Sequence, residues 1–80
     1  MTMKENDLLT LRIECTLFFQ GNPYALETEE GLALRTGRKV EHLKPVLNDL
    51  VNSSILERLG EGDQAIYRYA EPYFNDGMSF

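Results

Sequence analysis

The sequence predicts an α+β domain in which three helices precede a β-hairpin. Aliphatic residues recur at helical spacing in three segments before position 53, and a glycine-rich connector then separates two short runs of β-favouring residues. Eighty residues is the size of one domain, and 42% hydrophobic with 26% charged residues is ordinary for a globular chain. We therefore expect a flexible N-terminus at 1–7, one domain at 8–72 and a C-terminal tail at 73–80.

The first helix is predicted from Asp7 to Gln20, with Asn6 or Asp7 as its cap. Four of its apolar residues recur at spacings of three and four: Leu8, Leu11, Cys15 and Phe18. Three more widen this stripe: Leu9, Ile13 and Leu17. A stripe this broad predicts a helix that is covered over much of its surface. Gly21-Asn22-Pro23 ends the helix, because Gly tolerates a left-handed cap and Pro cannot continue a helix.

A short second helix is predicted after an extended stretch at 24–27. Thr28 is its N-cap candidate, and Glu29 and Glu30 follow in the first turn, where carboxylates complement the helix dipole. The side facing the core is predicted to carry Leu32, Ala33 and Leu34. Gly37 is the expected C-terminal stop.

The third helix has the clearest pattern and is predicted from about Lys39 to Asn52. Four of its apolar residues fall at spacings of three and four: Val40, Leu43, Leu47 and Leu50. Two further valines, Val46 and Val51, broaden this face. Pro45 is the local misfit, because an interior proline removes a backbone donor and costs about 3 kcal/mol. It points away from the apolar face, so we expect either a kink there or a loosely helical start.

Two strands are predicted at 55–59 and 65–70. The connector Gly60-Glu61-Gly62-Asp63-Gln64 holds two glycines and an aspartate, which is typical of a hairpin. Pro72 ends the second strand, and no order is expected beyond Phe74.

This order of elements resembles a winged helix-turn-helix. Residues 28–37 resemble the first half of the motif, with small Ala33 facing the partner helix, and residues 40–57 resemble the recognition helix entering the first wing strand. The stretch is similar to the ArsR-like and MarR-like bacterial regulators, which usually have Gly where this chain has Ser54. The resemblance covers residues 8–70 and implies a DNA-binding regulator, although winged helices serve both DNA and protein partners.

The basic residues are concentrated in one short part of an acidic chain. The formal net charge is −5, yet four of the eight basic residues fall within 35–44. The predicted DNA-contact set comprises the exposed side of the third helix, near 38–52, and the two wing strands: Arg38, Lys39, His42, Lys44, Asn48, Arg58 and Arg68. Four acids on the same surfaces oppose phosphate: Glu41, Asp49, Glu61 and Asp63.

The sequence supports two possible functions. One is a small winged-helix transcription regulator that binds double-stranded DNA. In it, Arg38 and Asn48 read base edges, and Lys39 and Lys44 reach phosphates. The alternative is a protein-interaction module without DNA binding, with a homodimer left open. Its contacts would come from the acidic wing and from residues outside the main core pattern: Tyr24, Tyr73, Phe74, Met78 and Phe80. A simpler reading is that Tyr73 and Phe74 only cover the first helix.

Neither an enzyme nor a metal site is predicted. Cys15 and His42 are the only residues of their types, and neither has a second soft ligand at metal-binding spacing. Cys15 is predicted to be a buried thiol rather than a redox sensor, and His42 a surface residue or a base contact. Glu29 and Glu30 diverge on a helix, so we interpret them as dipole partners rather than as an acid and a base.

No targeting or membrane segment is expected. No apolar run approaches the roughly 20 residues that cross a bilayer, and Met1–Asp7 carries no secretory signal. A single cysteine cannot form an internal disulfide, which fits a reducing compartment. The expectation is a cytoplasmic protein with no cofactor and no membrane partner.

Overall fold

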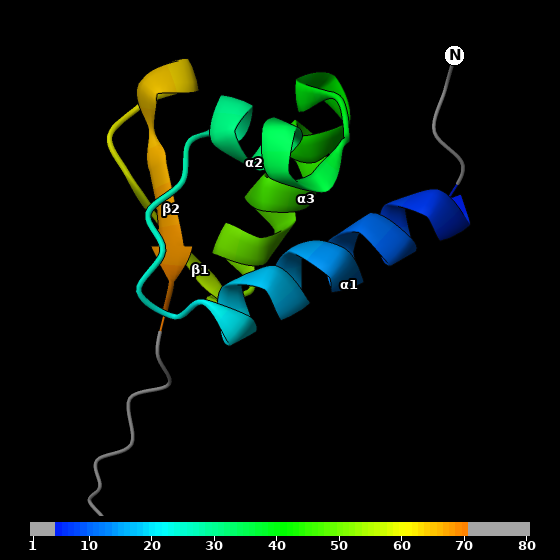
Figure 1. The fold of residues 1–80 in the computed structure, drawn as a ribbon, viewed down its shortest axis with the longest axis horizontal. Helices are drawn as coiled ribbons and strands as arrows, with labels where there is room; N and C mark the ends of the chain where they lie inside the picture. The colour runs from blue at the N-terminus through cyan, green and yellow to red at the C-terminus, as the bar shows by residue number, and fades with distance from the viewer. Residues whose placement is uncertain (1–4, 71–80) are drawn as a thin grey trace, which may run out of the picture.

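The computed structural model describes residues 5–70, with side chains from residue 7 onward. Its elements in order are α1 (Glu5–Gly21), α2 (Glu29–Thr36), α3 (Val40–Asn52), β1 (Leu56–Leu59), the 3₁₀ turn η1 (Gly62–Gln64) and β2 (Ile66–Tyr69). Three helices followed by a two-stranded antiparallel hairpin confirm the predicted α+β fold class, and the layout is that of a winged helix (Figure 1). The predictions for residues 1–4 and 71–80, including Tyr73 and Phe74, lie outside the described residues.

Helix α1 buries one face and leaves the other open. It begins at Glu5, so part of the N-terminal segment that was predicted to be flexible is helical. Leu11, Cys15 and Phe19 are fully buried on its core side. Helices α2 and α3 lie on one side of α1 (Figure 1), so the predicted covering of much of the helix surface is wrong at three apolar residues, which remain exposed. Those residues are Leu9, Ile13 and Leu17.

Both predicted ends of α2 are confirmed. The Thr28 hydroxyl oxygen accepts a hydrogen bond from the Gly31 N–H at 3.1 Å. Gly37 adopts a left-handed conformation, with φ 71°, and its N–H donates to the Ala33 carbonyl. Leu32 is fully buried, but Leu34 is 87% exposed, against the prediction. The two side chains lie about 200° apart at 100° per residue, so one helix face cannot bury both.

Helix α3 supplies the largest share of the core, through Leu43, Val46, Leu47 and Leu50. It runs unbroken from Val40 to Asn52, so the alternative of a loosely helical start before Pro45 is wrong. Pro45 is exposed, as its position opposite the apolar face predicts. After the helix, Ser54 takes a left-handed φ of 63°, a conformation that favours glycine.

The hairpin pairs β1 with β2 in register Leu56↔Tyr69 to Leu59↔Ile66. The turn between them holds two left-handed glycines, Gly60 and Gly62. Glu27 adds an isolated antiparallel bridge to Tyr67, with backbone hydrogen bonds of 3.1 and 2.7 Å. The predicted extended stretch at 24–27 therefore contributes one bridge beside the hairpin.

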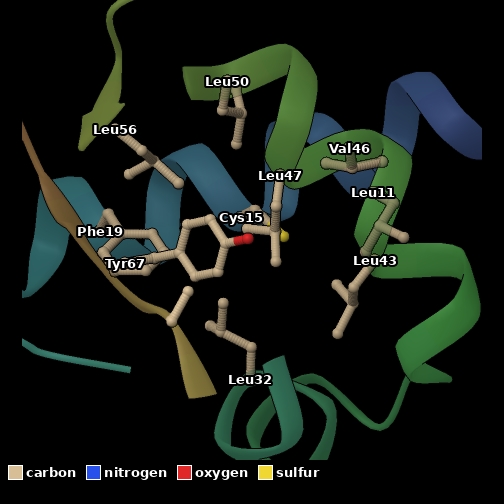
Figure 2. Packing of buried hydrophobic residues seen from close by; sticks show 11 residues of the cluster. Leu11, Cys15, Phe19, Leu32, Leu43, Val46, Leu47, Leu50, Leu56 and Tyr67 are labelled. Atoms are coloured by element: carbon tan, nitrogen blue, oxygen red, sulfur yellow. The ribbon is translucent and has the colours of Figure 1, made fainter. Parts of the chain in front are cut away.

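Side chains from all three helices and from the hairpin form one core. Figure 2 shows Leu32, Leu47 and Tyr67 directed into a common space from α2, α3 and β2. The cluster consists of Leu11, Cys15, Phe19, Leu32, Leu43, Val46, Leu47, Leu50, Leu56, Ala65 and Tyr67. Within residues 5–70, no helix has the length and apolarity to cross a bilayer.

Candidate functional site

A groove of about 390 Å³ separates the start of α2 and the exposed side of α3 from the hairpin. It brings together three of the seven predicted DNA-contact residues, Lys44, Asn48 and Arg58. We call the exposed side of α3, this groove and the hairpin turn the α3–wing surface. The groove is lined by Glu29, Lys44, Asn48, Arg58, Gly60, Glu61, Gly62 and Tyr67.

A buried carboxylate holds Lys44 in this groove. Glu29 is only 5% exposed, and its Oε1 lies 3.0 Å from the Lys44 Nζ. The hydrogen bond that the Lys44 Nζ donates to Glu29, and then the negative charge of Glu29, raise the pKa of Lys44 above the ordinary value. The sequence predicts only a helix-dipole role for Glu29, because no local pattern links residues fifteen positions apart. Lys44 therefore already has an anionic partner within the chain.

Arg58 and Asn48 bind each other across the same groove. The Arg58 Nε donates to the Tyr67 hydroxyl oxygen at 3.0 Å, and its Nη2 donates to the Asn48 Oδ1. The guanidinium carbon also lies 5.3 Å from the centre of the Tyr67 ring. Both polar side chains are thus fixed by contacts within the chain.

Two more predicted DNA contacts are engaged elsewhere. Arg38 precedes α3 and reaches α1, where its Nη2 lies 3.0 and 2.9 Å from the two carboxylate oxygens of Glu14. The prediction that it shares the outward face of α3 with Asn48 is therefore wrong. Arg68 pairs with Glu57 at 2.6 Å, directly across the hairpin register.

The remaining two, Lys39 and His42, lie at the start of α3. Within residues 5–70 neither side chain makes an ion pair or a side-chain hydrogen bond. Three exposed acids on the same surface, Glu41, Glu61 and Asp63, have no ion-pair partner in that part of the chain either. Lys39 is thus the one cation of the predicted set that lacks a bonded partner among the described residues.

Helix α1 carries a surface of another kind, which we call the α1 stripe. It consists of Leu9, Ile13 and Leu17, which are 57%, 50% and 61% exposed. Their spacing of four places them on one face of the helix, with Ile13 at its centre. The breadth of the apolar pattern is the sequence signal for this surface, although the pattern by itself predicts burial.

No charged side chain lies on the α1 stripe. The two charged residues between Leu9 and Leu17 are turned toward α3 and the residues just before it. Arg12 pairs with Asp49 of α3 at 2.5 Å, and Glu14 pairs with Arg38. The pairing also removes Asp49 from the α3–wing surface, where it was expected to oppose phosphate. The outward side of α1 is therefore apolar or neutral along this stretch.

An apolar groove opens at the Leu9 end of the α1 stripe. Its volume is about 290 Å³, and it lies between the first turns of α1 and the middle of α3. Leu8, Pro45 and Val46 supply its apolar walls, and the Arg12–Asp49 pair stands at its edge. The groove extends the exposed apolar surface from α1 onto α3.

The remaining chemistry-bearing residue, Cys15, is buried in the core as predicted. Burial and then the charge of Glu14 raise the pKa of its thiol to about 11, with Arg38 acting in the opposite direction. No group of three His, Cys, Asp or Glu residues within residues 5–70 has an arrangement that could hold a metal ion.

Comparisons of the whole chain with family models, curated proteins and solved structures found no match.

Proposed function

We propose that this chain is a winged-helix protein-interaction module whose contact surface is the α1 stripe. The observation that carries the proposal is a row of three apolar side chains, each at least half exposed, on a helix face without charge. A helix that is apolar on both sides is typical of one that is covered on both sides, yet the core covers only one side of α1. Contiguous exposed apolar surface of this kind marks interaction sites.

The electrostatics of the α3–wing surface support a protein partner over DNA. A duplex-binding protein gains affinity by placing several Lys or Arg side chains on phosphates. In the described part of this chain, five basic residues, among them Lys44 of that surface, are held in ion pairs with acids of the same chain: Arg12, Arg35, Arg38, Lys44 and Arg68. The net charge of −5 adds a long-range repulsion of phosphate.

A second candidate function is binding of double-stranded DNA by a transcription regulator. One feature favours it: Lys44, Asn48 and Arg58 converge in one groove, with Lys39 and His42 on the same helix. Exposed ion pairs contribute only about 0–1 kcal/mol each, so such side chains can exchange a carboxylate for a phosphate at small cost.

Titration of ¹⁵N-labelled protein with a random-sequence duplex at low salt separates the two functions. The proposal predicts no saturable shift of amide signals in residues 38–48 or 58–68. Salt-sensitive shifts in those residues would overturn it in favour of DNA binding. In that event Lys39→Ala should weaken binding, while Arg35→Ala, which removes a cation paired with Glu27, serves as the matched control.

A further inference from the structure

We infer that the α1 stripe packs against the α1 stripe of a second copy of this chain, in a two-fold symmetric dimer centred on Ile13. The inference rests on the proposed function and names the partner of the same surface.

The spacing of the stripe suits helix-on-helix packing with an identical partner. Leu9, Ile13 and Leu17 form one row of side chains four residues apart. Two such rows interdigitate at a crossing angle of about −50°, the commonest class of helix packing. The row is symmetric about Ile13, with a leucine four residues away on each side and a threonine three residues away on each side. A two-fold axis beside Ile13 brings this apolar row against its own copy, because such an interface uses the same patch on both copies.

The charges beside the stripe favour a neutral partner. Arg12 and Glu14 flank it, but Asp49 and Arg38 of the same copy already neutralise them. A strongly charged partner would therefore find no opposite charge among the described side chains of this face, and those of a second copy bring no unpaired charge to it. The α1 stripe itself is the neutral, apolar helix face of matching length that the described part of this chain offers.

The apolar surface available sets the expected strength of the dimer. Helix α1 has 17 residues, so it is about 25 Å long. Stable, specific interfaces bury about 1,200–2,000 Å² in total, which is more than three side chains from each copy supply. The groove beside Leu9, lined by Leu8, Pro45 and Val46, extends the contact onto α3. We therefore expect a reversible dimer whose population depends on protein concentration.

This arrangement leaves the groove between α3 and the hairpin open in each copy. That groove, which holds Lys44, Asn48 and Arg58, shares no lining residue with the α1 stripe or with the apolar groove beside Leu9. A dimer formed through the stripe would thus carry two unobstructed grooves of this kind.

The first test is sedimentation equilibrium of the full chain over a wide concentration range. As concentration increases, the average mass of the wild type should rise from the monomer mass toward twice that mass. Ile13→Asp should remain monomeric at every concentration. Leu34→Asp is the matched control, because it places the same charge on an exposed apolar residue of α2 and should behave as the wild type. Ile13 is half exposed, so Ile13→Asp should keep its helical circular dichroism.

Cross-linking tests the position of the two-fold axis. Ile13→Cys should form a covalent dimer on mild oxidation, since residues beside a two-fold axis come within the Cα separation of about 4.4–6.8 Å that a disulfide requires. Cys15 does not compete, because it is buried and the pKa of its thiol is about 11. Leu34→Cys should cross-link at least tenfold more slowly.

A wild type that stays monomeric would overturn the inference, as would equal cross-linking at positions 13 and 34. If the protein is monomeric and also does not bind duplex DNA, the dimer is ruled out but the proposed function is not. If the wild type and Ile13→Asp both bind duplex DNA, the proposed function is wrong. The mass of the wild type would still show whether the dimer forms.

Discussion

The outward side of α1 and the α3–wing surface differ in the charged side chains that they carry. The α1 stripe has no charged side chain, and three apolar residues face solvent there. The α3–wing surface is rich in charge, but Lys44 is paired with Glu29, and Arg58 is bonded to Asn48 and Tyr67. The first surface retains apolar area that a partner can remove from water, and the second retains little positive charge that is not already engaged.

This difference teaches that a basic segment in the sequence is not by itself a binding surface. Four basic residues lie within 35–44, yet three of them form ion pairs with Glu27, Glu14 and Glu29. Those acids come from α1, from the stretch before α2 and from its first turn. The same fold that collects the cations therefore also supplies their partners.

The largest expected effect separates the two faces of α1. Leu11→Ala, on the core face, should lower the free energy of unfolding by about 2–5 kcal/mol, because it leaves a cavity among buried neighbours. Leu9→Ala, on the α1 stripe, should cost less than about 1 kcal/mol when measured at concentrations where the chain is monomeric. Urea unfolding of both variants measures the contrast. Equal losses would mean that the stripe is part of the monomer core.

A smaller effect is expected where α3 passes into the wing. Ser54 has a left-handed φ of 63°, and a residue with a Cβ adopts that conformation at a cost of about 1–2 kcal/mol. Ser54→Gly also loosens the unfolded chain, so the net gain in stability should be about 0.5–1 kcal/mol. Ser53→Gly is the matched control, because Ser53 has a φ of −89° and should gain nothing. A thermal shift of the same sign in both variants would contradict this account.

The smallest effect concerns the engaged charges of the α3–wing surface. The pKa of Lys44 is raised by Glu29, so the pair stabilises the folded state fully below the ordinary lysine pKa of 10.5 and loses that contribution as pH rises through the raised value. The stability difference between wild type and Lys44→Met should therefore be constant at neutral pH and shrink above about pH 10.5. Lys39→Met, which removes a lysine without a bonded partner among residues 5–70, should show no such difference. A Lys44→Met difference that does not change with pH would mean that the ion pair contributes nothing.

Local patterns in the sequence were sufficient to predict the order of the elements. Thr28, Gly37 and the Gly60–Gln64 connector each determine backbone geometry through their own chemistry, and each occurs in the structure as predicted. Periodicity also identified the buried residues of α3. These features depend on contacts between residues close together in the chain, which is why sequence reasoning could predict them.

The candidate sites depend on contacts that periodicity does not reveal. The pairing of Arg38 with Glu14 joins residues 24 positions apart, and the pairing of Lys44 with Glu29 joins residues 15 apart. The breadth of the apolar pattern on α1 was visible in the sequence, but the sequence did not show that α2, α3 and the hairpin would cover one side of it. Leu34 was placed in the core for a similar reason, since a single helix turn does not show which residue faces inward.

The most direct test of the central claim is a dilution series of ¹⁵N-labelled wild-type protein followed by amide chemical shifts. The account predicts concentration-dependent shifts in α1 centred on residues 9–17, with the α3–wing signals unchanged. Shifts centred instead on residues 38–48 and 58–68, or none over a range in which the mass doubles, would contradict the claim that the α1 stripe is the contact surface of this chain.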